Sequence, residues 1–219
     1  VADHAFALMI ALARKLNAID SEFRRNGWFW PADQYCGVDL EGKTLGLIGL
    51  GRIGRKMARR ATGFEMRLVA CDPYADPLSF QLDSTHIESA NLDDLLARSD
   101  FISVHCTLTP ETRQLLGERE FRLMRSTAVL IDVSRGAMID ETALLAALRD
   151  GRLAGAGLDV FPEEPLPPVH PLLSLPNVIV TPHLAWFTKE AAARQSAQAA
   201  DAVLDLITGR RPRSVVNAV

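Results

Sequence analysis

The sequence predicts a doubly wound α/β fold, in which a parallel β-sheet lies between two layers of helices. Six short runs rich in Val, Ile and Leu lack the polar–apolar alternation of a half-exposed strand, as is typical of parallel strands covered on both faces. Helical segments separate these runs, and strands that alternate with helices form three-layer α/β/α sheets. The predicted strands are residues 44–48, 67–71, 101–104, 128–133, 156–160 and 178–181.

The helices between these strands have signals at their ends. Apolar residues recur at helical spacing from Ala2 to Leu16. Asn91, Asp140 and Thr188 precede three further segments in the position of N-cap residues, and glycines follow the last two of these segments. We therefore expect helices over 2–16, 55–61, 92–98, 141–149 and 189–207.

Composition and charge exclude several classes of protein. The chain has 219 residues, with 24 Lys and Arg against 27 Asp and Glu and a formal net charge of −3. This balance argues against a nucleic-acid-binding surface. The apolar stretch near the start covers only residues 5–13, whereas a membrane span needs about twenty. Apolar residues make up 48% and charged residues 23%, as in a soluble globular protein.

The three cysteines are odd in number and widely spaced, at Cys36, Cys71 and Cys106. This spacing fits neither a disulfide framework nor a zinc site, so we expect a reduced, cytoplasmic protein without a metal. Residues 19–42 form a long irregular stretch that contains Trp28, Phe29 and Trp30. Such loops usually have a function. These aromatic side chains either pack beneath a neighbouring helix or contact another subunit.

A glycine-rich turn follows the first predicted strand. Gly49, Gly51 and Gly54 form the pattern G-x-G-x-x-G, and a helix is expected next. The first glycine permits the tight turn, the second lets the backbone approach a pyrophosphate, and the third lets helix and strand pack closely. Asp72 ends the next strand, where a carboxylate accepts hydrogen bonds from the adenosine ribose. The turn predicts a Rossmann-type fold, and the carboxylate favours NAD over NADP because it repels a 2′-phosphate.

Three polar residues follow predicted strands in the second half of the chain, namely Arg135, Glu164 and His183. Ligands of parallel sheets bind outside the carboxyl ends of the strands. Reduction of a keto acid needs a cation for the substrate carboxylate, which Arg supplies with a planar fork, and a proton donor, which is usually His. A carboxylate beside the His would orient it. Each residue alone would also fit a structural role, such as a salt bridge, a solvated loop or a strand cap.

Several stretches together resemble the NAD-binding part of the D-isomer-specific 2-hydroxyacid dehydrogenases. That family includes the glyoxylate/hydroxypyruvate reductases and the C-terminal-binding-protein corepressors. The matching stretches occur in the family's order and cover nearly the whole chain. They are residues 1–4, 46–54, 72–74, 105–112, 134–136, 158–165 and 181–183.

The resemblance implies roles for the substrate-facing residues. Arg135 would bind the substrate's carboxylate and carbonyl, and His183 would be the general acid and base. Glu164 would pair with that imidazole and favour its protonated form. Trp186, in a position typical of the glyoxylate/hydroxypyruvate-type and corepressor-like members, would either roof a small substrate or pack against the last helix. One departure is Asp132, which stands where the family usually has Asn.

The resemblance also implies cofactor contacts. Asp159 would hold the nicotinamide carboxamide, and Arg52 and Ile53 would lie along the pyrophosphate. Thr112 would lie near the ribose-phosphate and Val133 near the nicotinamide ring.

The family pattern predicts a domain organisation as well. Residues 1–186 would form the NAD-binding domain, with an interdomain-type helix at 1–18 and a dimerisation arm at 19–42 that joins a homodimer. Residues 187–219 would form a helix and tail that pack on a separate N-terminal substrate lobe, which is absent from this sequence. The expected function is an NAD-dependent D-2-hydroxyacid dehydrogenase acting on a small 2-hydroxy or 2-keto acid. The alternatives are a corepressor-like NAD(H)-binding interaction module and a truncated NAD-binding fragment without turnover.

Overall fold

The protein consists of two compact units, Val1–Ala185 and Trp186–Val219. The computed structural model describes residues 1–30, 32–75, 81–82, 85–212 and 215. Part of the predicted C-terminal tail, residues 213–214 and 216–219, lies outside the described residues.

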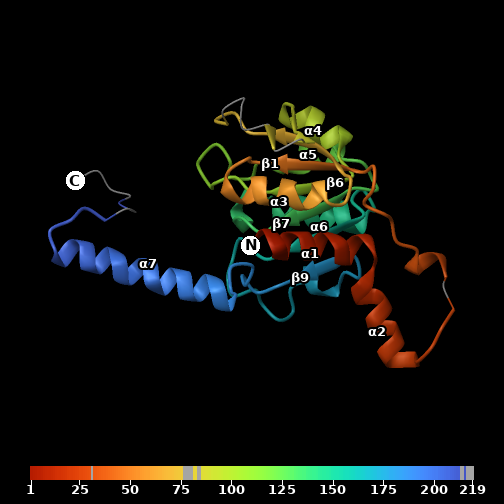
Figure 1. The fold of residues 1–219 in the computed structure, drawn as a ribbon. Coiled ribbons are helices and arrows are strands. Elements are labelled where there is room, and N and C mark those ends of the chain that lie inside the picture. Colours follow the sequence, from red (N-terminus) through yellow and green to blue (C-terminus); the bar gives the residue numbers. More distant parts are fainter. Residues whose placement is uncertain (31, 76–80, 83–84, 213–214, 216–219) are drawn as a thin grey trace. The chain divides into compact units, whose positions relative to one another are not determined.

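The first unit contains a seven-stranded parallel sheet with the order β5-β2-β1-β6-β7-β8-β9 (Figure 1). The chain builds outward from β1 to β2 and β5 on one side, and from β6 to β9 on the other. The strand order therefore reverses between β1 and β6, where doubly wound sheets open a ligand-binding crevice. The strands are β1 Thr44–Ile48, β2 Arg67–Cys71, β5 Glu88–Ser89, β6 Phe101–Val104, β7 Val129–Asp132, β8 Gly155–Leu158 and β9 Val178–Val180.

Helices cover both faces of this sheet, which confirms the predicted α/β/α fold. Helices α1 (Ala2–Ala13) and α3 (Arg52–Thr62) pack side by side on one face (Figure 1). Helices α4 (Leu92–Arg98), α5 (Glu118–Leu123) and α6 (Glu141–Arg149) pack on the other. The shorter elements are the strand pair β3 Gln81–Leu82 and β4 Thr85–His86, and the 3₁₀ turns Asp33–Tyr35, Gly136–Met138 and Pro171–Ser174.

The alternation of side chains along each strand divides the core into two clusters. Val129 and Ile131 of β7 pack in the cluster that contains Phe6 and Met9 of α1. Leu130, between them, packs in the cluster beneath α4, α5 and α6. Because both faces of the strand are buried, every position can be apolar, which explains the continuous apolar runs in the sequence.

The largest difference from the sequence prediction lies after α1. This helix ends at Ala13 instead of Leu16, because Lys15 adopts a left-handed backbone conformation with φ of 52°. A second helix, α2, then covers Leu16–Asn26 and includes the first part of the stretch 19–42, which we expected to be irregular. The expected strands 128–133, 156–160 and 178–181 differ from β7, β8 and β9 by a residue or two at their ends.

The aromatic side chains after α2 do not share one environment. Trp28 and Trp30 are 78% and 80% exposed, so neither packs beneath a neighbouring helix of this chain. Phe29 contacts the ring of Tyr35, with 4.9 Å between the ring centroids. The two tryptophans therefore remain available to a partner.

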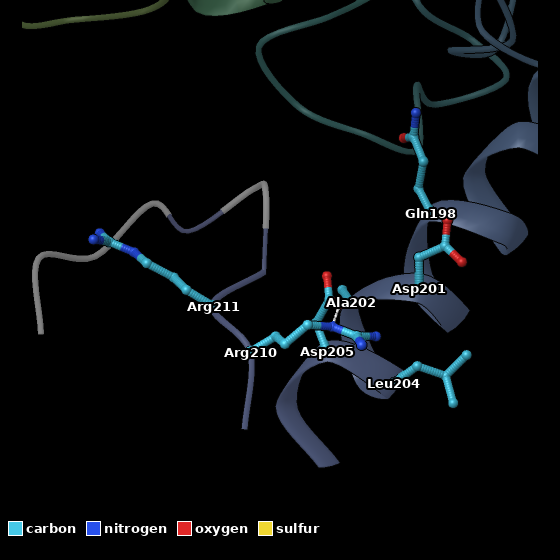
Figure 2. A pocket seen from close by; sticks show the side chains of 7 residues that line it. All are labelled: Gln198, Asp201, Ala202, Leu204, Asp205, Arg210 and Arg211. Carbon is cyan, nitrogen blue, oxygen red and sulfur yellow. Dashed lines mark hydrogen bonds and ion pairs between the residues drawn. The ribbon is translucent and has the colours of Figure 1, made fainter. Parts of the chain in front are cut away.

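The second unit contains helix α7 (Lys189–Ile207), which begins at the predicted N-cap residue Thr188. Beyond the helix the chain folds back, and Arg210 donates from Nε to Asp205 Oδ1 at 2.9 Å (Figure 2). Arg211 points away from this pair. The Arg210 cation thus stabilises the C-terminal end of α7. None of the described helices is both long and apolar enough to cross a membrane.

Candidate active site

The glycine-rich turn joins β1 to α3 at the carboxyl edge of the sheet. Gly49 has a φ of 95°, and a Cβ atom there would lie 2.6 Å from the backbone nitrogen of Cys106. A Cβ on Gly54 would lie 2.2 Å from the carbonyl oxygen of Gly49. A Cβ on Gly51 would meet nothing within 4 Å. The first and third glycines thus permit close packing, whereas the second faces open space that a ligand can enter.

Helix α3 begins at this turn, three positions earlier than expected. Gly51 is its N-cap residue, and Arg52 and Ile53 are its first helical residues. The first N–H groups of a helix have no intrahelical acceptor, and the helix dipole makes this end positive. Gly51 supplies no side-chain cap to them. These N–H groups fit a pyrophosphate.

Asp72 lies beside the same turn, directly after β2. Its Oδ2 accepts a hydrogen bond from the N–H of Leu50 at 2.8 Å, and its Oδ1 accepts one from the N–H of Tyr74 at 3.0 Å. The carboxylate is thereby held next to the phosphate-binding turn. This is where a dinucleotide's ribose hydroxyls find an acceptor.

Glu164 and His183 form a hydrogen-bonded pair at the carboxyl ends of β8 and β9. His183 Nδ1 lies 2.7 Å from Glu164 Oε2, and Glu164 Oε1 accepts a hydrogen bond from the N–H of Phe161 at 3.0 Å. Burial alone would raise the pKa of Glu164, but these hydrogen bonds and the charges of His183 and Arg135 outweigh burial and lower it. Glu164 is therefore an anion near neutral pH, and it holds one imidazole nitrogen while the other stays available for proton exchange.

Arg135 lies on the loop after β7, the strand adjacent to β8. Its side chain is exposed, and its guanidinium donates to the carbonyl oxygen of Ser134 at 2.7 Å. The neighbouring Gly136 packs against Phe161 so closely that a Cβ would lie 2.1 Å from the Phe161 carbonyl carbon. The Arg135 loop and the Glu164 loop therefore touch, and the three predicted catalytic side chains belong to loops at one edge of the sheet.

A cavity of about 540 Å³ lies directly beside the His183–Glu164 pair. The pair supplies the ionisable side chains of the wall of this cavity. The rest of its wall is formed by Phe161, Pro165, Leu166, Leu173, Val180, Thr181 and Pro182. Another cavity, of about 610 Å³, lies away from this pair, where the end of α1 meets the starts of β7 and β8.

Two other predicted cofactor contacts lie on segments that follow strands of this sheet. Thr112 Oγ1 accepts a hydrogen bond from the N–H of Thr109 at 2.7 Å and donates to the carbonyl of Thr107 at 2.8 Å, which fixes the loop after β6. Val133 directly follows β7 and is 7% exposed.

Trp186, the predicted substrate contact, is the first residue of the second unit, where its ring contacts Phe187 edge-on with 5.2 Å between the centroids. Its predicted contact with substrate stays a prediction.

Asp159 differs from the other predicted contacts because its side chain is completely buried. Its carboxylate accepts hydrogen bonds from the hydroxyl of Thr181 and from the N–H groups of Leu184 and Ala185. His4 contacts the same Thr181 hydroxyl. Sequence reasoning did not single out His4 or Thr181, although both lie in stretches that match the family. No group of three or more His, Cys, Asp or Glu side chains within the described ranges is placed to hold a metal ion.

Comparison with known proteins identifies the family. Residues 6–185 match the model of the D-isomer specific 2-hydroxyacid dehydrogenase, NAD binding domain. The chain is 42% identical over 218 residues to a glyoxylate reductase of Korarchaeum cryptofilum, covering 99% of this chain and 65% of that protein. It is 38% identical over 216 residues to a D-3-phosphoglycerate dehydrogenase of Archaeoglobus fulgidus, covering 99% of this chain and 40% of that protein.

The fold is also similar to that of a solved dehydrogenase structure. The crystal structure of D-lactate dehydrogenase with NAD+ from Lactobacillus jensenii superimposes with a TM-score of 0.89 at 30% identity, covering 99% of this chain and 68% of that one. The chain thus spans about two thirds or less of the curated relatives' length. Its glycine turn, the N-terminus of α3 and Asp72 fit the dinucleotide that such a domain binds. The chain belongs to the D-isomer specific 2-hydroxyacid dehydrogenase family, and its residues 6–185 correspond to the NAD-binding domain of that family.

Proposed function

We propose that this chain supplies the cofactor-binding and acid–base half of an NAD-dependent D-2-hydroxyacid dehydrogenase that reduces a small 2-keto acid. The observation that supports it is the 2.7 Å contact between His183 and Glu164, which borders a cavity and shares one sheet edge with the Arg135 loop. An ionised carboxylate behind an imidazole is the arrangement that proton transfer to a substrate oxygen requires.

Each residue has a distinct task in this proposal. NADH, when bound, supplies a hydride to the keto carbon. Arg135 binds the substrate carboxylate through its planar guanidinium and polarises the keto oxygen. Protonated His183 donates its Nε2 proton to that oxygen as negative charge develops there. Glu164 holds the imidazole in the orientation for this transfer through its hydrogen bond to Nδ1. In the reverse direction His183 accepts the proton from the hydroxyl group.

The names of the relatives support a substrate class for this proposal. Two of the similar proteins above carry the names glyoxylate reductase and D-3-phosphoglycerate dehydrogenase. We favour a small keto acid such as glyoxylate as the substrate. We further propose that the protein is a homodimer joined through residues 19–42, because Trp28 and Trp30 are exposed on this arm.

The same two exposed tryptophans support a second candidate. An NAD(H)-binding interaction module would use the cofactor to stabilise a dimer and the arm to recruit partners. A third reading is a domain that binds NAD(H) without turnover. The arm favours the module over the plain fragment, whereas the intact acid–base pair favours the enzyme.

Turnover separates these candidates. We would follow NADH oxidation at 340 nm with glyoxylate, hydroxypyruvate, pyruvate and phenylpyruvate, and NADH binding by fluorescence. The variant His183→Asn removes the imidazole while tolerating the left-handed backbone at this position, where φ is 56°. We expect turnover to fall by a factor of about 10² or more with NADH affinity nearly unchanged. Undiminished turnover would refute the role of His183, and NADH binding without wild-type turnover would leave the module or the fragment.

A further inference from the structure

The loop that carries His183 needs support from its surroundings. His183 adopts a left-handed conformation with φ of 56°, which is unfavourable for a residue other than glycine. Its N–H donates to the backbone carbonyl of Asp159 at 2.8 Å. Such a backbone conformation persists only where neighbouring groups fix it, so the contacts of this loop decide where the imidazole lies.

The carboxylate of Asp159 fixes the loop on the far side of His183. Its Oδ1 accepts a hydrogen bond from the N–H of Leu184 at 2.9 Å, and its Oδ2 accepts one from the N–H of Ala185 at 2.8 Å. These are the two residues that directly follow His183. Because the carboxylate is completely buried, its charge is stabilised by these donors instead of by solvent.

Thr181 supplies a third donor, and the direction of this hydrogen bond determines the role of His4. The Thr181 hydroxyl donates to Asp159 Oδ1, which as a carboxylate oxygen can only accept. The hydroxyl has a single hydrogen, so the 2.8 Å contact between its oxygen and His4 Nε2 requires His4 to donate. The resulting chain of hydrogen bonds runs from His4 through Thr181 and Asp159 to the backbone after His183.

This series of hydrogen bonds joins three separate elements. His4 lies in the first turn of α1, Thr181 directly follows β9, and Asp159 directly follows β8. Helix α1 packs on both of these strands. The network therefore ties the position of the His183 loop to the position of α1.

We propose that His4 and Thr181 are positioning residues for His183, acting through the buried carboxylate of Asp159. Both act through Asp159 and neither exchanges a proton with the substrate, although Thr181 also lines the cavity beside the His183–Glu164 pair. The effect on turnover rests on the proposed function. Loss of the Thr181 hydroxyl or of the His4 donor leaves Asp159 with weaker hydrogen bonding, and the carboxylate then holds the N–H groups of Leu184 and Ala185 less firmly.

Matched pairs of variants test this chain of hydrogen bonds. Thr181→Val removes the hydroxyl with little change in volume, whereas Thr181→Ser retains it. His4→Leu removes the donor, whereas His4→Gln places an amide N–H near the former Nε2. We expect each disrupting variant to lower kcat by a factor of about 10 to 100, because small displacements of a catalytic group are costly. NADH affinity and KM should change by less than about twofold, and both conservative variants should restore most of kcat.

A second readout does not depend on turnover. Amide hydrogen exchange of Leu184 and Ala185, measured by NMR, should be at least about tenfold faster in Thr181→Val than in wild type or Thr181→Ser. If wild type lacks turnover with every keto acid, the proposed function fails for this chain, and the exchange rates alone decide the positioning proposal. Unchanged exchange in Thr181→Val, or kcat within twofold of wild type in both disrupting variants, would overturn it.

Discussion

Replacement of Asp132 by Asn is expected to change how the stability of the protein depends on pH. Asp132 ends β7 and is completely buried. Its Oδ1 accepts hydrogen bonds from the N–H and hydroxyl of Ser134, at 2.8 and 2.6 Å. Its Oδ2 has no partner among the residues that the structure describes. Burial raises the pKa of Asp132 to about 7, although the hydrogen bonds from Ser134 act in the opposite direction.

The magnitude follows from the two protonation equilibria. An Asp in an unfolded chain has a pKa of about 3.9. In the folded protein the Asp132 carboxyl therefore keeps its proton up to about pH 7, whereas in the unfolded chain the same carboxyl releases it near pH 4. The stabilisation is complete below the unfolded pKa and is lost as the pH rises through the folded one. At ~1.4 kcal/mol per unit, the step from pH 5 to pH 8 removes at most about 3 kcal/mol.

The assay is urea denaturation of the wild type and Asp132→Asn at pH 5 and pH 8. The variant keeps an oxygen for Ser134 and has no proton to release, so all other titrating groups are shared and cancel in the difference. The free energy of unfolding of the variant, relative to wild type, should rise by up to about 3 kcal/mol between pH 5 and pH 8. A difference that stays constant across this range would refute the buried, proton-binding carboxyl.

Three further substitutions probe the site and its scaffold. Gly136→Ala puts a Cβ within 2.1–2.5 Å of the Phe161 backbone, and we expect a loss of about 1–3 kcal/mol in urea denaturation. Asp140→Ala removes the N-cap hydrogen bond of α6 and should cost about 1 kcal/mol, which Asp140→Ser should largely restore. Asp72→Ala should weaken NADH binding about tenfold in calorimetry and narrow the preference for NADH over NADPH, because a charged acceptor is lost.

The sequence predicted those elements whose signals are local. The strands Thr44–Ile48, Arg67–Cys71 and Phe101–Val104 have the expected bounds, as do the helices that follow Asn91, Asp140 and Thr188. The first and third of these strands are buried throughout, and Arg67–Cys71 is buried over its three central residues. Each of these helices has an N-cap side chain that accepts a hydrogen bond from its first turn. Apolar runs and capping residues report these interactions directly.

Helix α2 shows a start without such a signal. Its N-cap residue supplies no side-chain cap and no residue of α2 is buried, although Gly27, with φ of 75°, follows its C-terminal end. Its start depends on the left-handed conformation of Lys15, which has no signature in residue type because Lys rarely adopts it. The helix is supported instead by side-chain pairs such as Asp20 with Arg24, at 2.7 Å. The sequence therefore suggested an irregular stretch.

In the candidate site, too, some features have a local sequence signal and others do not. The glycine turn is local, and a parallel sheet places the loops of Arg135, Glu164 and His183 at one edge whatever their separation in sequence. Which side chain faces which is a different matter. The pairing of His4 with Thr181 spans 177 positions and depends on how α1 lies across β8 and β9, which no local pattern encodes.

Asp159 makes this argument concrete. The family resemblance implies that Asp159 holds the nicotinamide carboxamide. Its carboxylate is nevertheless buried and accepts hydrogen bonds from the backbone that follows His183. One carboxylate oxygen can accept more than one hydrogen bond, so a contact with the cofactor and support of the loop are compatible. Removal of the carboxylate would then disturb both the cofactor and the imidazole, and would not distinguish the two roles. The Thr181 hydroxyl donates to Asp159 and is not among the predicted cofactor contacts. Its valine and serine variants therefore separate the two roles that substitution of Asp159 would combine.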